Sequence, residues 1–283
     1  MGQLEQKRAV ITGAASGIGA ATAKAYIAEG ASVVLCDIDD ARGEALAKSL
    51  GDQATYVHVD VAKEGAIEVA LEVSNERFGG LDVLFNNAGT PGTIGSILEA
   101  SVEGFDQTMA VHLRGVFLGI RAGGRIMAAQ GHGSIINTGS VAGLQANFAG
   151  HDYSAAKAGI IHLTETAANE LGELGVRVNA VCPGFIATAI FGRAAGLDAD
   201  QAQKSIELMA MSAADVAPIR RAGLPMDIAQ LVVFLGSDAS SFVTGQRIAV
   251  DGGLTTGRLY RDSLKNAPEG LALIRDAVSS MAE

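Results

Sequence analysis

The fold is decided by residues 8–30, which read RAVITGAASGIGAATAKAYIAEG. A short apolar run, Ala9-Val10-Ile11, leads into the glycine-rich turn of residues 12–19, and an alanine-rich helix is expected over residues 17–29. Glycines in such a turn let backbone N–H groups approach a pyrophosphate at the helix N-terminus. A glycine pattern alone is a weak signal in a chain with 36 glycines, but the strand before it and the helix after it strengthen the prediction of a dinucleotide site.

Beyond this unit, short β-branched runs alternate with longer helical patterns. The runs are apolar on both faces, as a parallel sheet covered by helices requires. We therefore predict an α/β fold of the Rossmann type, a doubly wound, seven-stranded parallel sheet with right-handed crossovers and helices on both faces. The strands are expected at residues 9–11, 32–36, 56–59, 83–85, 134–137, 176–181 and 247–250. Further helices are expected at residues 41–50, 64–78 and 154–173.

The organisation of the chain favours one domain. At 283 residues and 48% hydrophobic content the chain can bury a sizeable core, and we expect a single dinucleotide-binding and catalytic domain over residues 1–283. Two segments depart from the alternation. Residues 188–222 form a long connection that is expected to cover the substrate, and residues 254–283 form a tail with an amphipathic stretch at residues 271–281.

Charge and composition argue against several kinds of partner. A net charge of −10 disfavours nucleic acid and anionic membranes. Cys36 and Cys182 lie in apolar runs without metal-ligand spacing, so we expect buried free thiols and no metal site. The first residues contain no apolar signal core, and no run approaches the ~20 apolar residues that span a bilayer. We expect a soluble cytoplasmic protein.

An acidic residue ends the second predicted strand. Asp37 lies eighteen positions beyond Gly19, where a carboxylate can accept hydrogen bonds from both hydroxyls of an adenosine ribose and would repel a 2′-phosphate. Asp37 could instead cap the next helix, but Asp39 and Asp40 can take that position. We therefore predict NAD(H) rather than NADP(H) as the cofactor.

Polar residues also close the third and fourth predicted strands. Asp60 follows the third strand, and Asn86-Asn87-Ala88-Gly89 follows the fourth. Such residues are common in turns. Because ligands of these sheets bind outside the carboxyl ends of the strands, their repeated placement there favours a cofactor crevice.

A tyrosine and a lysine supply the candidate chemistry. Tyr153 and Lys157, in HDYSAAKAGI, are four residues apart and therefore share one helix face. A free tyrosine ionises near pH ~10, and a neighbouring cation lowers that pKa, so the pair could act as an acid/base. Taken alone the pair is a weak signal, because tyrosine and lysine at this spacing usually mark a solvated helix face.

Several motifs in order resemble one family. With TGAASGIG, NNAG, Ser140, YSAAK and Pro183-Gly184, residues 4–257 resemble the short-chain dehydrogenase/reductase family in its NAD(P)-dependent branch of ~250 residues. The resemblance implies that Tyr153 is the catalytic acid/base. Lys157 would hold the nicotinamide ribose and lower the pKa of the tyrosine, and Ser140 would hydrogen-bond the substrate oxygen.

The resemblance also implies a cofactor site and an assembly state. Residues at the phosphate turn would be Gly13, Ser16 and Ile18. The adenine and nicotinamide ends would contact Asp60, Val61, Asn87, Ile186 and Thr188. Many members are tetramers, so a homotetramer is expected.

One position departs from the family pattern. Where the family usually has an asparagine that supports a water-mediated proton path to the lysine, this chain has His112. A histidine on an apolar helix is more often a hydrogen-bonded core residue than a catalyst, yet imidazole can relay protons near neutral pH. His112 therefore stays a candidate catalytic residue beside the structural interpretation.

The sequence thus predicts reversible hydride transfer between NAD and a secondary alcohol or its ketone. An apolar pocket wall favours a cyclic or bulky hydrophobic substrate, although each wall residue could instead pack a subunit interface. An anionic substrate stays possible because the connection over residues 188–222 also carries four basic residues, Arg193, Lys204, Arg220 and Arg221. The expected wall is Val141, Leu144, Gln145, Phe148, Phe191, Leu197, Leu208 and Met209. One alternative is a 3-oxoacyl-type reductase, which Asp37 opposes. Another is a non-enzymatic cofactor-binding protein, which the presence of both Tyr153 and Lys157 opposes.

Overall fold

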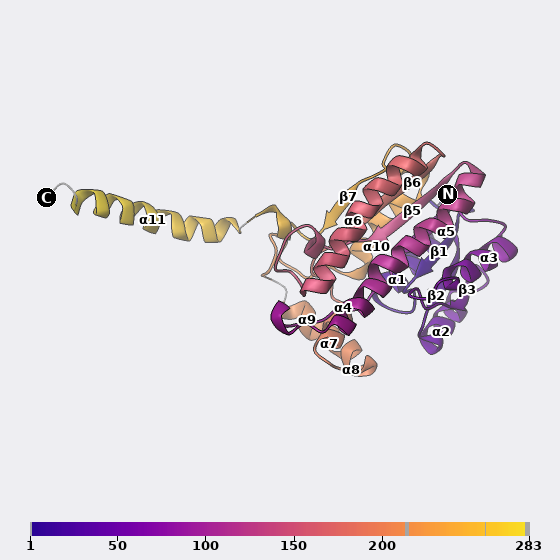
Figure 1. The fold of residues 1–283 in the computed structure, drawn as a ribbon, viewed down its shortest axis with the longest axis horizontal. Helices are drawn as coiled ribbons and strands as arrows, with labels where there is room; N and C mark the ends of the chain where they lie inside the picture. Colours follow the sequence, from indigo (N-terminus) through magenta and orange to yellow (C-terminus); the bar gives the residue numbers. More distant parts are fainter. Residues whose placement is uncertain (1, 213–214, 258, 281–283) are drawn as a thin grey trace.

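The centre of the molecule is a seven-stranded parallel sheet with strand order β3-β2-β1-β4-β5-β6-β7 (Figure 1). The computed structural model describes residues 2–212, 215–257 and 259–280, with residues 261–269 and 276 as backbone alone. The strands are β1 (Arg8–Thr12), β2 (Ser32–Asp37), β3 (Ala54–His58), β4 (Val83–Asn86), β5 (Gly133–Thr138), β6 (Val176–Pro183) and β7 (Arg247–Val250). The prediction of a doubly wound, seven-stranded parallel sheet is confirmed.

The strand order creates a crevice in the middle of the sheet. The chain begins with β1, adds β2 and β3 on one side, and then crosses to the other side for β4 to β7. The loops that leave the carboxyl ends of β1 and β4 therefore diverge to opposite faces, which is where ligands bind in open α/β sheets. The residues predicted to carry chemistry follow the carboxyl ends of strands or lie on the helix after β5, except His112, which lies in the connection between β4 and β5.

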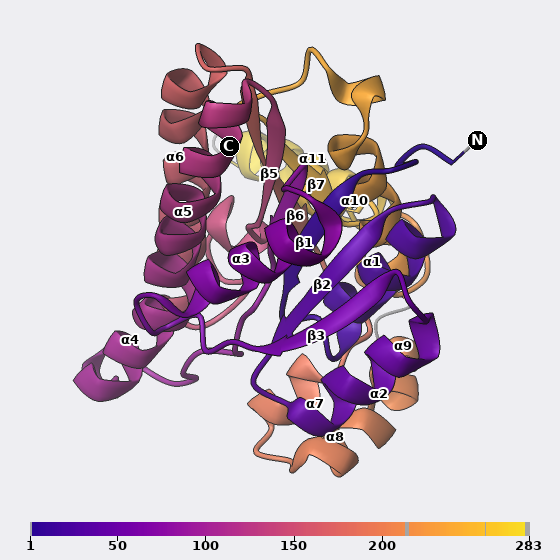
Figure 2. The ribbon, with the colours of Figure 1, turned by 90° about the vertical axis from the view of Figure 1, so that its right-hand side faces the viewer.

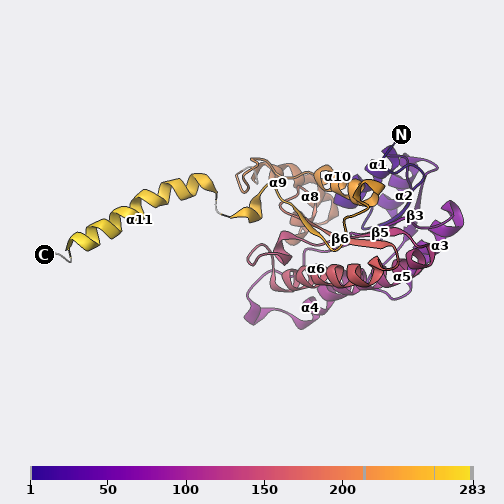
Figure 3. The same ribbon diagram turned by 90° about the horizontal axis from the view of Figure 1, so that it is seen from above.

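Helices cover both faces of the sheet, as Figure 3 shows. One face packs against α1 (Gly17–Ala28), α2 (Asp40–Leu50) and α10 (Pro225–Gly236). The other face packs against α3 (Ala66–Phe78), α5 (Gly115–Gln130) and α6 (His151–Gly172). Alternate side chains of a strand enter the two cores, so that Val33 and Leu35 face the first set while Val34 faces the second. Burial on both sides explains why the central strands are apolar throughout.

The remaining elements lie in the connections. Between β4 and α5 the chain forms η1 (Ile97–Glu99), α4 (Val102–Met109) and the π-helical turn η2 (Ala110–Arg114), and η3 (Val141–Gly143) follows β5. The long connection after β6 contains α7 (Ile190–Ala194), α8 (Ala199–Lys204) and α9 (Ile206–Ser212), and it lies beside α2 (Figure 2), where Asp200 pairs with Arg42 at 3.1 Å. After α10 come η4 (Asp238–Ser240), η5 (Leu254–Thr256) and α11 (Tyr260–Ser280).

The tail is helical and leaves the body of the molecule. Both Figure 1 and Figure 3 show α11 extending away from the sheet and its covering helices. The predicted amphipathic stretch of residues 271–281 falls in this helix, except that Met281 lies outside the described residues. Its apolar side chains are exposed, with Leu271 at 69% and Ile274 at 63%.

Some local expectations are confirmed and one is wrong. Asp39 caps α2, accepting a hydrogen bond from the Arg42 backbone N–H at 3.1 Å, and both cysteines are buried free thiols. Strand β7 is not apolar and buried on both faces, because it lies at the edge of the sheet and leaves Arg247 and Ala249 exposed. In the part of the chain that the structure describes, no helix has the length and apolar character needed to traverse a bilayer.

Candidate active site

A cavity of about 480 Å³ lies at the carboxyl ends of the strands. The four candidate catalytic residues all line it: Ser140, Tyr153, Lys157 and His112. The residues expected at the phosphate turn and the adenine also line it: Gly13, Ser16, Ile18, Asp37, Asp60 and Val61. The same holds for those expected near the nicotinamide: Asn87, Ile186 and Thr188. The fold therefore brings together thirteen residues that are spread over more than 170 positions of sequence.

The glycine-rich turn fits a dinucleotide. Gly13 and Gly17 adopt positive φ angles of 65° and 53°, which favour glycine. A side chain at Gly19 would collide with the backbone carbonyl of Gly13, so the helix start and the turn touch directly. The Ser16 side chain makes no capping hydrogen bond at the start of α1, which leaves the first N–H groups of the helix free for an anion.

Asp37 joins the end of β2 to this turn. Its Oδ2 accepts a hydrogen bond from the Ala15 backbone N–H at 2.9 Å. Its Oδ1 accepts from the backbone N–H groups of Ile38 at 2.8 Å and Asp39 at 3.1 Å. The carboxylate is therefore fixed at the rim of the cavity, and carboxylate oxygens have further lone pairs that can accept from ribose hydroxyls.

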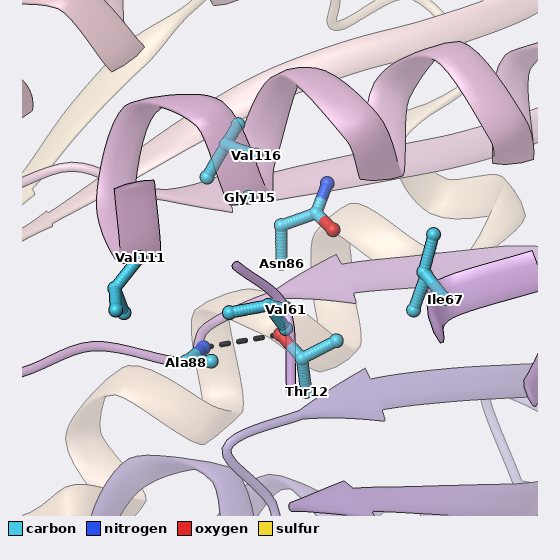
Figure 4. Close-up of a pocket in the computed structure, with 8 residues that line it drawn as sticks. All are labelled: Thr12, Val61, Ile67, Asn86, Ala88, Val111, Gly115 and Val116. Atoms are coloured by element: carbon cyan, nitrogen blue, oxygen red, sulfur yellow. Dashed lines mark hydrogen bonds between the residues drawn. The ribbon is translucent and has the colours of Figure 1, made fainter. Parts of the chain in front are cut away.

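Thr12, which the sequence reasoning missed, ties the ends of β1 and β4 together. Its Oγ1 accepts hydrogen bonds from the backbone N–H groups of Asn87 at 2.9 Å and Ala88 at 3.0 Å, and Figure 4 shows the contact with Ala88. The Asn87 side chain completes the tie by donating from Nδ2 to the Thr12 carbonyl at 3.0 Å and accepting from the Thr138 hydroxyl at 3.3 Å. The sequence signal that could have identified Thr12 is its place as a polar residue at the end of an otherwise apolar strand.

Tyr153 and Lys157 project from one face of α6 into the cavity, as their spacing predicts. The Lys157 Nζ donates to the Thr138 carbonyl at 2.7 Å and lies 5.4 Å from the centre of the Tyr153 ring. Ser140 is buried at the start of η3, where its Oγ accepts from the Ala142 backbone N–H at 3.1 Å.

Burial, rather than the neighbouring amine, dominates the acid–base properties of the pair. Burial raises the pKa of Tyr153 to about 12, although the hydrogen bond with Ser140 lowers it in part. Burial also lowers the pKa of Lys157 to about 7. Burial is thus the largest influence on both groups in this structure, and the expectation that Lys157, aided by a positive nicotinamide ring, lowers the tyrosine pKa stays a prediction.

His112 is packed as a neutral core histidine. It lies on the π-helical turn η2, is 1% exposed, and its Nε2 lies 3.1 Å from the Thr90 backbone nitrogen, which donates to it. Its ring meets the Tyr153 ring edge to face at 5.1 Å. Burial and the charge of Lys157 lower the pKa of His112 to about 3, so the imidazole is uncharged at neutral pH. This disfavours a relay in which His112 gains and loses a proton near neutral pH.

The substrate wall differs in part from the prediction. Val141, Phe148 and Phe191 line the cavity, and Phe191 stacks on Phe185 with 4.3 Å between ring centres. Five expected wall residues are not part of the lining: Leu144, Gln145, Leu197, Leu208 and Met209. Phe185 was missed because it sits in an irregular loop after β6, where no period shows which way a side chain points.

Contacts elsewhere in the molecule explain why Gln145 and Leu208 do not line the cavity. The Gln145 Nε2 donates to the Thr255 carbonyl at 2.8 Å, which turns this side chain toward the tail. In α9, Ile206 and Ala210 face the buried residues Ala187 and Ala222, so the helix phase leaves Leu208 on the surface, whereas Met209 is half-buried and is not part of the lining.

Comparisons with known proteins identify relatives of this chain. Residues 13–255 match the family model described as enoyl-(acyl carrier protein) reductase. The chain is 43% identical to momilactone A synthase of Oryza sativa subsp. japonica, covering 89% of this chain and 91% of that protein. It is 40% identical to the 3-alpha-(or 20-beta)-hydroxysteroid dehydrogenase of Mycobacterium tuberculosis, covering 92% and 94%.

Solved structures give the same result. The crystal structure of levodione reductase superposes with a TM-score of 0.81 at 34% identity, covering 90% of this chain and 100% of that one. A short-chain type dehydrogenase/reductase from Mycobacterium marinum also gives 0.81, at 32% identity, covering 90% and 97%. With these matches over most of its length and a shared fold, the chain belongs to the short-chain dehydrogenase/reductase family, whose members are oxidoreductases that use nicotinamide cofactors.

Proposed function

We propose that this protein catalyses reversible hydride transfer between NAD and a hydrophobic, cyclic or bulky secondary alcohol and its ketone. The observation that carries the proposal is the convergence of Tyr153, Lys157 and Ser140 with the glycine-rich turn in one cavity. The names of two relatives, a hydroxysteroid dehydrogenase and levodione reductase, support the alcohol/ketone chemistry. The single domain, the homotetramer and the cytoplasmic location stay predictions.

The residues divide the work of the reaction. A bound nicotinamide supplies the hydride acceptor or donor. Tyr153 moves the proton at the substrate oxygen, and its high pKa keeps the phenol protonated and able to donate to a ketone at neutral pH. Ser140 hydrogen-bonds the same oxygen while charge develops on it. Lys157, anchored on the Thr138 carbonyl, keeps further N–H groups for the nicotinamide ribose.

Two features support NAD and an apolar substrate. Asp37 presents a fixed carboxylate where the adenosine ribose would bind, and a 2′-phosphate there would be repelled. Val141, Phe148 and the stacked pair of Phe185 and Phe191 give the cavity apolar and aromatic surface.

The proposal is tested by following NADH absorbance with the purified protein. Turnover of cyclic or polycyclic ketones with NADH, and of the matching alcohols with NAD, would support it. Turnover limited to 3-oxoacyl thioesters would favour the alternative reductase. Tight NADH binding without turnover across a broad panel would favour a non-enzymatic cofactor-binding protein.

The pH dependence should differ between the two directions. Alcohol oxidation requires the Tyr153 phenolate, whose fraction rises about tenfold per pH unit below the pKa, so kcat/KM for oxidation should rise from pH 6 toward pH 10. Ketone reduction uses the protonated phenol, so Tyr153 alone should leave its kcat/KM nearly level over this range, and a change near pH 7 would report the loss of the proton from Lys157, whose pKa is about 7. Initial rates at saturating cofactor check this, and an oxidation rate that is flat or falls with pH would contradict it.

His112→Asn should keep substantial activity. The imidazole is buried and uncharged, so we expect kcat to stay within about tenfold of the unmodified protein, the range of a single lost hydrogen bond. Steady-state kinetics measure the change. Complete loss of turnover with an intact fold by circular dichroism would show instead that His112 is chemically essential.

A further inference from the structure

Asp152 has no assigned role, yet its carboxylate joins three segments of the active site. It precedes Tyr153 in the first turn of α6 and is 4% exposed. Its Oδ2 accepts from the Thr93 backbone N–H and hydroxyl, both at 2.9 Å, and from the Thr108 hydroxyl at 2.8 Å. Its Oδ1 accepts from the Tyr153 backbone N–H at 2.7 Å. One side chain therefore links the loop after β4, helix α4 and the turn that carries Tyr153.

The loop held by this carboxylate is a wall of the cavity. We call residues 90–94 the 90–94 loop, and its members Thr90, Pro91 and Ile94 line the cavity. Asp152 itself is not part of the lining. Its hydrogen bonds therefore reach the cavity through the 90–94 loop and the turn that holds Tyr153, and its charge also acts on His112, whose pKa it raises.

The loop and the helix touch closely enough to require glycine on both sides. Gly92 has a φ of 72°, and a Cβ there would lie 2.9 Å from the Tyr153 Cβ. A Cβ at Gly150 would collide with the Thr93 carbonyl. The backbone of the 90–94 loop thus packs directly against the start of α6. The Asp152 carboxylate stabilises this contact by accepting hydrogen bonds from Thr93 and from the Tyr153 backbone N–H.

The negative charge suits its four donors. Burial alone would raise the pKa of Asp152, but the hydrogen bonds from Thr108, Thr93 and Tyr153 outweigh it and hold the pKa below its usual range. An ionised carboxylate also interacts favourably with the N-terminus of α6. Asparagine has the same shape but would direct an NH2 group at donors, so the contact should loosen.

We infer that Asp152 is a positioning residue, which holds the 90–94 loop against the Tyr153 turn and so sets the distance between the substrate wall and the phenol. The inference rests on the proposed function for its kinetic consequences. Because the 90–94 loop is a wall of the cavity and lies outside the glycine-rich turn, we expect the loss of these contacts to weaken substrate binding while cofactor binding is kept.

The test compares Asp152→Asn with Asp82→Asn. Asp82 is a matched control, because it is 7% exposed and accepts hydrogen bonds from Arg8, yet it precedes β4 at the opposite end of the sheet. Asp152→Asn should raise KM for the ketone about tenfold, the effect of one lost hydrogen bond to a charged group, with the Kd for NADH within about twofold. Asp82→Asn should lower the melting temperature without changing KM.

Hydrogen exchange provides a readout that does not need turnover. In Asp152→Asn, amides of the 90–94 loop and of Tyr153 should exchange at least about tenfold faster, while those of β1 and β4 keep their protection. Thr108→Val removes a single donor and should produce a smaller change, and adding it to Asp152→Asn should have little further effect.

The outcomes separate the two proposals. Unchanged exchange in the 90–94 loop, or faster exchange with an unchanged KM, would overturn the positioning role. If Asp152→Asn fails to fold, the same criteria apply to Thr108→Val. If the unmodified protein turns over no ketone, the proposed function fails, and the exchange result alone then decides whether Asp152 fastens the loop.

Discussion

Tyr153→Phe should abolish turnover while the cofactor still binds. We expect kcat to fall by about 10²–10⁴-fold, the usual contribution of a positioned acid/base group. Phenylalanine keeps the ring and its edge-to-face contact with His112 at 5.1 Å, so the cavity should keep its shape. Single-turnover kinetics with NADH and a ketone measure the loss, and quenching or enhancement of NADH fluorescence measures the Kd, which should change by less than about threefold.

Tyr26→Phe is the matched control for this substitution. The Tyr26 hydroxyl is also buried but donates to the Val232 carbonyl at 2.9 Å, in the core between α1 and α10. Its removal should cost about 1 kcal/mol of unfolding free energy and leave kcat unchanged. The assignment of Tyr153 as the proton donor would be abandoned if Tyr153→Phe retained a tenth or more of the normal kcat.

Asp37→Asn should reverse much of the discrimination against NADPH. The unmodified protein should prefer NADH, because the carboxylate accepts from ribose hydroxyls and repels a 2′-phosphate. Losing the charge should shift the ratio of kcat/KM values, NADH over NADPH, by about hundredfold, as expected for charge-assisted hydrogen bonds. Asparagine keeps one oxygen that can accept from the Ala15 N–H, so the glycine-rich turn should stay in place, whereas its NH2 group would face the N–H groups of Ile38 and Asp39 and should loosen the turn after β2.

Asp40→Asn distinguishes this effect from a general loss of negative charge. Asp40 lies three residues away, where its Oδ1 contacts the Tyr56 hydroxyl and the His58 ring, both at 2.7 Å, outside the cavity lining. The cofactor ratio should stay within about threefold of normal in this variant. Equal shifts in both variants would show that Asp37 does not contact the ribose.

Much of the fold was predictable because the central strands are buried on both faces. Runs such as β1 and β2 therefore carry apolar residues without interruption, and strand ends are marked by glycine, asparagine or aspartate. The convergence of Asp37, Asn87 and Ser140 followed from one rule, that the carboxyl ends of parallel strands meet at one edge. Edge strand β7 escaped the pattern because only part of its surface is covered.

Other features depend on three-dimensional detail that local sequence does not carry. The orientation of Gln145 depends on a carbonyl 110 residues away, and that of Leu208 on the phase of a short helix in an irregular connection. The sign of the Tyr153 pKa shift depends on how completely the phenol is removed from water, which spacing alone cannot give. Asp152 directly precedes Tyr153 in the segment HDYSAAKAGI, but its partners Thr93 and Thr108 belong to a separate part of the chain.

The two ends of the sheet have different tolerances for change. At the amino end, the Asp82 carboxylate binds Arg8 and lies 3.2 Å from the His132 ring, which secures the strands far from the cavity. At the carboxyl end, the wall includes loop residues such as Ile94, Phe148 and Phe185. Laboratory evolution restricted to those loops should therefore yield variants with new substrate preferences and an unchanged melting temperature. Random substitution along the whole chain should instead produce mostly variants that are insoluble.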